Sequence, residues 1–153
     1  RDLHFFNDNY ADLLYSSHTL EYFDRLQVNE ALTEWNRVLK RGGILRISVP
    51  DFKSIVEVYT KYENLDHQGI LGPLYGKWNC VNENNISHIY HKTVFDYKSL
   101  EIILIANNFK EIKRYDWRNT IHADFDDYSQ AYIPHMDKEG GKLMSLNIEA
   151  TKN

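Results

Sequence analysis

The spacing of hydrophobic positions alternates along the chain between the periods of strands and helices, which predicts a mixed α/β domain. Residues 11–16 are a short apolar run without helical spacing, as expected of a strand. Residues 28–39 place their apolar side chains at intervals of three and four, which gives a helix one apolar face. Residues 44–49 are again short and apolar, and they predict a second, buried strand.

Capping residues mark the ends of the first predicted helix. Asp24 is expected to begin it, because a side-chain oxygen there accepts hydrogen bonds from free backbone amides. Gly42 and Gly43 are expected to end it, because glycine adopts the left-handed conformation common after helices. Lys40 and Arg41 would then lie in the last turn, where positive charge is favourable.

Two further helices are predicted, each with an aspartate at its start. Asp51 is expected to cap a helix that runs to about Tyr62, and Asp96 a helix that runs to about Asn107. Their apolar positions are Ile55, Val56, Tyr59, Leu100, Ile103 and Leu104.

The remaining segments are two strands and two long connections. Residues 65–93 show no sustained period and are expected to form a loop, which at this length is usually functional, here a lid or substrate loop. Residues 111–117 and 144–150 are expected to be strands, and residues 118–142 a polar connection with a short helical piece at 128–132. The predicted core comprises Leu13, Leu14, Leu32, Trp35, Leu39, Leu45, Ile47, Val49, Leu104, Ile112, Leu146 and Ile148.

Composition narrows the class of protein. The 153 residues are 42% hydrophobic, enough for one domain with a packed core. The net charge of -4 gives no reason to expect nucleic acid or a membrane as partner. Cys80 is the only cysteine, so no internal disulfide forms and a cytoplasmic location is expected. The chain opens with Arg1 rather than Met, and we expect the biological start to lie upstream.

The most informative residues follow the first predicted strand. The run YSSHTLE, from Tyr15 to Glu21, places small polar groups where a strand ends, which is how open α/β sheets build ligand sites. Together with EWNRVLKRGGILRISVPDF and HKTVFDYKSLEIILIANNFKEIKRYD, it resembles the class I S-adenosylmethionine-dependent methyltransferase family over nearly the whole chain. The resemblance implies the second half of a doubly wound Rossmann-like sheet, strands four to seven, with the last two antiparallel.

The same resemblance implies a cofactor site for S-adenosylmethionine. Ser16, Ser17, His18 and Glu21 would lie beside the methionine part of the cofactor, and His18 would also be a catalytic candidate. Tyr22 stands where the family usually has a second histidine. The family's glycine-rich cofactor loop is not among these 153 residues, so we expect this chain alone to bind the cofactor poorly.

The long connection holds the other candidates. His91 is a second catalytic candidate, and with His88 it has the spacing of a weak metal pair, although two ligands do not make a site and no metal is expected. Tyr75, Trp78 and Tyr90 would line an aromatic pocket.

Structural roles explain the same residues and stay open. Ser16 and Ser17 end a strand in any case, His18 can orient the loop by hydrogen bonding, and Glu21 can cap backbone amides. Ordinary loop packing is the stronger explanation of His91, and core packing under the loop explains Tyr75, Trp78 and Tyr90 almost as well as a pocket does.

Two functions follow. The first is a methyltransferase whose cofactor half lies upstream, acting on a small-molecule or sugar-like acceptor. The second is a catalytically inactive methyltransferase-like remnant that serves as a binding or dimerisation module. The second rests on residues 11–16, which would present an apolar sheet edge able to pair with a second copy in a homodimer.

Overall fold

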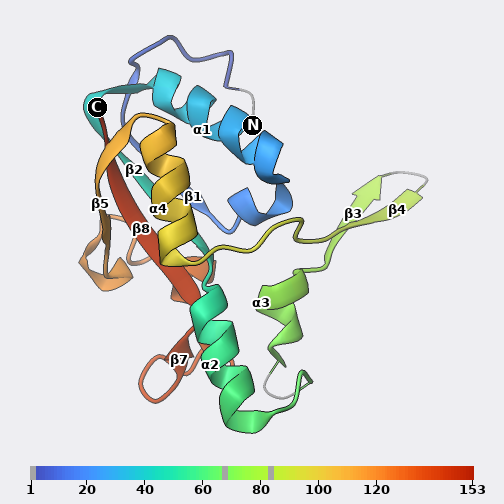
Figure 1. Ribbon diagram of the computed structural model, residues 1–153. Helices are drawn as coiled ribbons and strands as arrows, with labels where there is room; N and C mark the ends of the chain where they lie inside the picture. The colour runs from blue at the N-terminus through green and yellow to red at the C-terminus, as the bar shows by residue number, and fades with distance from the viewer. Residues whose placement is uncertain (1–2, 67–68, 83–84) are drawn as a thin grey trace.

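A four-stranded mixed sheet forms the centre of the protein, for which a computed structural model describes residues 3–66, 69–82 and 85–153 (Figure 1). In spatial order its strands are β1 (Ala11–Ser17), β2 (Leu39–Pro50), β8 (Ser145–Lys152) and β5 (Phe109–Arg114). Strands β1 and β2 are parallel, whereas β8 runs antiparallel to both of its neighbours. The predicted α/β class and the antiparallel pairing of the last two strands are therefore confirmed.

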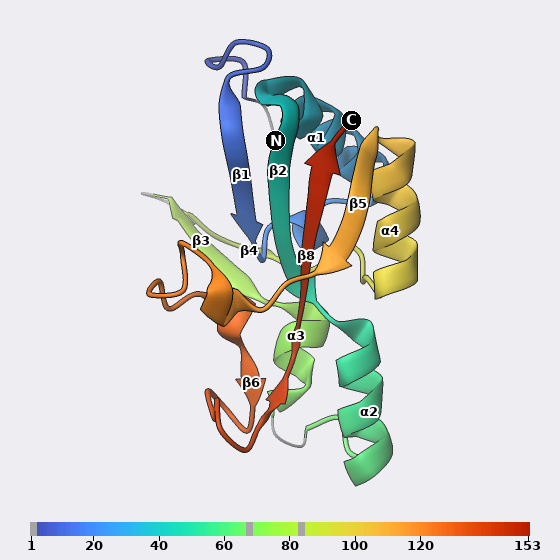
Figure 2. The ribbon, with the colours of Figure 1, turned by 90° about the vertical axis from the view of Figure 1, so that its left-hand side faces the viewer.

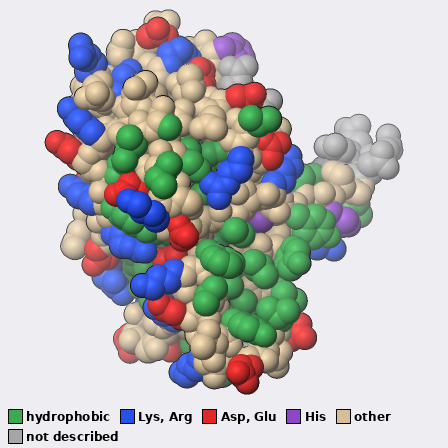
Figure 3. Space-filling model, viewed as in Figure 1, with side chains coloured by type: hydrophobic (Ala, Val, Ile, Leu, Met, Phe, Trp, Pro, Cys, Tyr) green, Lys and Arg blue, Asp and Glu red, His purple; other side chains and the backbone are tan. Residues whose placement is uncertain are grey.

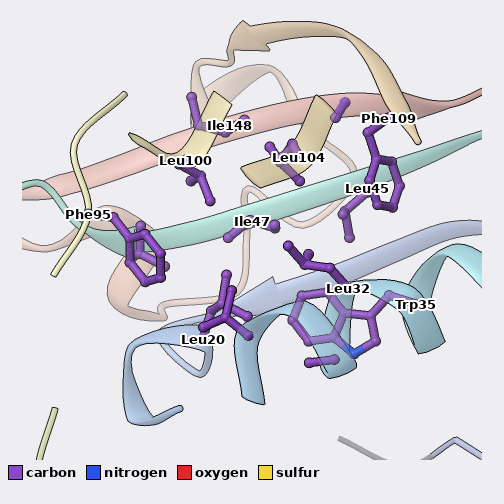
Figure 4. Close-up of a cluster of buried hydrophobic side chains, with 14 of the residues drawn as sticks. Leu20, Leu32, Trp35, Leu45, Ile47, Phe95, Leu100, Leu104, Phe109 and Ile148 are labelled. Carbon is purple, nitrogen blue, oxygen red and sulfur yellow. The ribbon is translucent and has the colours of Figure 1, made fainter. Parts of the chain in front are cut away.

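Helices α1 (Arg25–Val38) and α4 (Tyr97–Ala106) cover one face of this sheet, which buries the main core between them (Figures 2 and 4). Leu32 and Trp35 reach into the core from α1, and Leu104 reaches into it from α4. The predicted core residues that are buried in this cluster are Leu32, Trp35, Leu39, Leu45, Ile47, Val49, Leu104, Leu146 and Ile148. Leu14 and Ile112 pack against it partly buried, and Leu13 lies outside it.

The three predicted aspartate caps are confirmed. Asp24 and Asp96 each form a capping box. The aspartate side chain accepts amide hydrogen bonds from the first turn, and the side chain three residues later accepts one from the amide of the aspartate. Asp51 accepts a hydrogen bond from the amide of Lys53 at the start of α2 (Phe52–Tyr62). In α2 Val58 is buried instead of Val56 and Tyr59, which are 43% and 44% exposed.

The predicted end of α1 is wrong. The helix ends at Val38, and the two glycines lie inside β2, where Gly42 has a φ of 73°. The pairing of β1 with β2 shifts register between Ala11 and Leu13, so β2 has extra residues that form a bulge at this point. The chain thus turns into its strand before the glycines rather than after them.

Two other boundaries differ from the prediction. The strand expected at 111–117 is β5, which begins at Phe109 and ends at Arg114. The segment expected as an irregular loop, residues 65–93, contains the short helix α3 (Leu71–Tyr75) and a hairpin of β3 (Trp78–Asn82) and β4 (Asn85–Ile89). Figure 1 shows this hairpin projecting away from the sheet.

The connection between β5 and β8 packs against the other face of the sheet. It contains two 3-10 turns, Trp117–Asn119 and Tyr128–Gln130, and the short strands β6 (Tyr132–Ile133) and β7 (Lys142–Leu143). Asn147 on β8 donates a hydrogen bond of 2.9 Å to the carbonyl of Ser129. None of the helices in the described part of the chain has the length and apolar character to cross a bilayer.

Candidate functional site

A cavity of about 730 Å³ lies at the carboxyl end of β1. Three segments distant in sequence form its walls, namely residues 17–23, 69–91 and 128–144. A second, smaller cluster of apolar side chains from α2, β6 and the start of α3 supports it, comprising Ile55, Val58, Ile70, Ile133 and Met144. Figure 3 shows hydrophobic side chains gathered over α2 and α3 on the surface beside it.

His18 is held at the strand end by both its backbone and its ring. Its φ of 46° lies in the left-handed region, and its amide donates to the carbonyl of Ser48 at 2.8 Å. Its Nε2 lies 2.9 Å from Oγ of Ser145, whose own hydroxyl donates to the carbonyl of Tyr128. Because that hydroxyl proton is already used, Ser145 accepts from His18, so the ring proton sits on Nε2 and Nδ1 keeps its lone pair.

Glu21 lies behind His18 in a 3-10 turn, Leu20–Tyr22, with a relative exposure of 1%. Neither carboxyl oxygen has a hydrogen-bond partner, although Oε1 is 3.4 Å from Nδ1 of His18 and 3.8 Å from Nε2 of His91. Burial raises the pKa of Glu21 to about 8, because the charged form loses its hydration.

His91 approaches Glu21 from the opposite side. Its Nδ1 lies 3.2 Å from the carbonyl of Pro73, which can only accept, so Nδ1 carries the ring proton and Nε2 keeps its lone pair. Tyr22 packs edge-on against this ring at 4.8 Å between centroids, and its hydroxyl donates to the carbonyl of Gly76 at 3.0 Å. A side chain at Gly76 would collide with the imidazole.

The charges of this cluster follow from the contacts. Burial lowers the pKa of His18 to about 3 and also lowers that of His91, so both rings are neutral near pH 7. Two neutral imidazoles then present lone pairs to a carboxyl group that burial keeps protonated. Each ring has both nitrogens facing protein groups, so the cluster joins the end of β1 to the segment that carries His91.

The structure brings together three of the predicted site residues. Glu21 lies against both His18 and His91, and the two histidines line the cavity together with Ser17. Ser16 is buried and does not line the cavity.

The structure also bears on the weak metal pair, His88 and His91, and on the predicted aromatic pocket. His88 is exposed on the hairpin, where its Nδ1 is 2.9 Å from Asn79, and no metal-binding group of three or more His, Cys, Asp or Glu occurs among the described residues. Of the three predicted aromatic residues Trp78 lines the cavity, while Tyr75 and Tyr90 do not.

Several lining residues were missed because they lie far from β1 in the sequence. Tyr128 and Tyr132 come from the connection that is expected to be mostly polar, more than a hundred residues after the strand end. Met144 comes from the predicted final strand, and alternation along a strand cannot show that a residue faces a cavity. The aromatic residues in that polar stretch were the signal available.

Comparison with known proteins agrees with this fold. A family model described as a methyltransferase domain matches residues 1–47. No curated protein sequence matches the chain. An S-adenosylmethionine-dependent methyltransferase structure from Archaeoglobus fulgidus is 16% identical with a TM-score of 0.54, covering 98% of this chain and 63% of that one.

Two other structures are similar to the same extent. A methyltransferase of this class from Methanosarcina mazei is 18% identical with a TM-score of 0.52, covering 96% of this chain and 61% of that one. A possible histamine N-methyltransferase from Thermotoga maritima is 19% identical with a TM-score of 0.52, and the match covers 97% of this chain and 59% of that one. The chain therefore spans about three fifths of the length of these structures.

The fold is that of S-adenosylmethionine-dependent methyltransferases, and the resemblance to the class I family is confirmed. The residues at the strand end fit such a cofactor. Ser17 lines the cavity, and its hydroxyl is covered in this conformation and has no hydrogen-bond partner among the described residues, so rotation of the side chain would offer it to a bound molecule. Ser17 would hold that molecule, and His18 would fix the strand end that carries Ser17. When bound, S-adenosylmethionine supplies a methyl group carried on a sulfonium.

Proposed function

We propose that the chain is the C-terminal portion of an S-adenosylmethionine-dependent methyltransferase that acts on a small-molecule acceptor bound in the cavity. The observation that carries this proposal is the position of the cavity at the carboxyl end of β1. Open α/β sheets bind their ligands at this end, where loops leave the strands. A volume of about 730 Å³ lies within the range of pockets for small ligands.

The sheet order supports the assignment to the second half of the fold. Strands β1 and β2 take the places of strands four and five, and β5 and β8 those of the antiparallel pair six and seven. In this assignment residues 65–93 form the acceptor side, since α3 and the hairpin build one cavity wall.

Alignment of the acceptor is the main task of these residues. Methyl transfer requires the acceptor atom to approach along one line, and holding two reactants in place supplies several kcal/mol of barrier reduction. His18 and His91 fix the cavity wall through contacts at both ring nitrogens, and Glu21 joins them.

Cofactor binding by the strand end is tested by NMR titration of this chain with S-adenosylhomocysteine. Weak binding is expected, with shift changes around Ser17 and His18. Ser17→Val is expected to weaken it at least tenfold, because it removes a hydroxyl at the cavity wall. His18→Asn is expected to weaken it as well, because it removes the ring that fixes the strand end against Ser145. Thr60→Val, exposed on α2, is the matched control. Absence of shift changes, or equal affinity in all variants, would reject the proposal.

A second candidate function, an inactive binding or dimerisation module, is favoured by one observation. Strand β1 has β2 as its single neighbour in the described sheet, so its other edge has unpaired backbone groups. We infer that this edge pairs with a second copy when no other strand covers it.

The setting inferred for either function is the cytoplasm. Cys80 is a free thiol in the described chain, as expected of a protein in a reducing compartment.

A further inference from the structure

We infer that the cavity accepts a flat aromatic molecule rather than a sugar, and that, where the proposed methyltransferase function holds, this molecule is the methyl acceptor. Aromatic side chains enter the cavity from all three of its walls: Tyr22 from the strand end, Trp78 from the hairpin, and Tyr128 and Tyr132 from the connection before β8. Ile89 and Met144 add apolar surface. Rings stacked or set edge-on against a planar ligand contribute about 0.5–1.5 kcal/mol each beyond the area buried.

Many polar side chains of these walls are already used by the protein, while those of Ser17, Lys77 and His135 have no side-chain hydrogen bond among the described residues. The hydroxyl of Tyr22 donates to Gly76, and that of Tyr132 accepts from Arg118 at 3.1 Å. His18 and His91 each have both ring nitrogens facing protein groups. Few groups therefore remain to bind a ligand with many hydroxyls.

Sugars fit this wall poorly for an energetic reason. A sugar carries a hydroxyl on almost every carbon, and each one buried without a partner costs roughly 1–3 kcal/mol. An aromatic ligand with one polar group avoids that cost.

The charge of the cavity points the same way. Among the described lining residues Lys77 alone carries a full charge, and no carboxylate lines the cavity, because Glu21 lies behind the two histidines. The walls therefore offer an acceptor no carboxylate partner, and a neutral aromatic acceptor needs none.

Two of the rings are left exposed. Trp78 is 54% exposed and Tyr128 is 58% exposed, although both line the cavity. Large aromatic side chains at a cavity that remain open to water mark a surface that a ligand covers. Their place on two different walls would hold a ring between them.

The test is calorimetric titration of this chain with 2-naphthol and, separately, with methyl α-D-glucopyranoside. We expect 2-naphthol to bind at least tenfold more tightly than the glucoside. Trp78→Ala and Tyr128→Ala are each expected to weaken 2-naphthol binding at least fivefold, and both residues are exposed enough for the fold to survive their loss. Phe5→Ala removes a ring that is 85% exposed outside the cavity and is expected to leave binding unchanged.

Equal binding of the two probes, or naphthol binding that all three variants retain, would overturn the inference. The titration with S-adenosylhomocysteine separates this outcome from failure of the proposed function. Cofactor binding without naphthol binding leaves the methyltransferase proposal standing and removes the aromatic acceptor. Naphthol binding without cofactor binding leaves the aromatic ligand standing and removes the methyltransferase proposal.

Discussion

At the scale of single residues, Glu21 determines the chemistry of the site. Folding takes its carboxyl group out of water and gives neither oxygen a hydrogen bond, so the neutral form is favoured. The lone pairs of His18 and His91 face the same oxygen. A proton on Glu21 stabilises this arrangement, whereas its loss would leave three electron-rich groups together.

The free energy of unfolding is therefore expected to fall as pH rises towards 8. The pKa of Glu21 rises from its ordinary 4.5 to about 8 in the folded protein, so the folded state holds a proton that the unfolded chain releases. The stabilisation is complete below pH 4.5 and is lost as pH rises through 8. Between pH 6.5 and 8 the ionisation of Glu21 alone should lower the free energy of unfolding by roughly 2 kcal/mol, against which the buried histidines gain a smaller amount.

Urea unfolding at these two pH values measures this loss. Glu21→Gln keeps the shape without the ionisation, so relative to the unchanged protein its free energy of unfolding should rise by roughly 2 kcal/mol between these pH values. An unchanged alkaline loss in the variant would show that another group is responsible. His18, whose folded pKa is lowered to about 3, contributes in the opposite range, with stability lost as pH falls from 6.5 through 3.

At the scale of elements, α3 shows how a short helix positions a wall of the site. Gly76 ends it with a φ of 51°, and its lack of a side chain makes room for the ring of His91. Gly72, one turn earlier, faces open space. Two glycines of one helix therefore have different roles.

Substitution by alanine separates these roles. Gly76→Ala is expected to lower the free energy of unfolding by more than 1 kcal/mol, because it adds a collision to an unfavourable backbone conformation. Gly72→Ala should be neutral or stabilising by up to about 1 kcal/mol, since alanine favours the helix. Thermal unfolding measures both variants. Similar effects in the two variants would contradict the close packing of Gly76 against His91.

Elements were predicted well where the signal is local. The three aspartate caps and the periods of α1, α4 and β8 depend on residues within a turn or two. The end of α1 was wrong because the pairing of β2 with β1 extends the strand backward past Gly42. That pairing joins distant segments and leaves no mark on the local pattern. The hairpin of β3 and β4 was missed because none of its described residues belongs to either core cluster, so no buried face marks it in the sequence.

At the scale of the whole molecule, the unpaired edge of β1 has a consequence for assembly. Unpaired backbone amides and carbonyls on an edge strand bind further strands. We expect this chain, by itself, to form a dimer at micromolar concentration. Sedimentation velocity over a hundredfold range of concentration measures this, and a monomer throughout would remove the edge-pairing proposal. A longer chain that covers β1 is expected to be monomeric under the same conditions.

The sequence by itself determined the class of fold, the caps of the helices, most of the core and the polar group at the end of β1. These depend on periodicity and on residues that are neighbours along the chain. Only the tertiary structure decided that Glu21 meets His91 across seventy residues, and that rings after β5 close the cavity opened by Ser17 and His18. Contacts of this kind depend on where the sheet brings its loops together, and no local pattern of side chains encodes that distance.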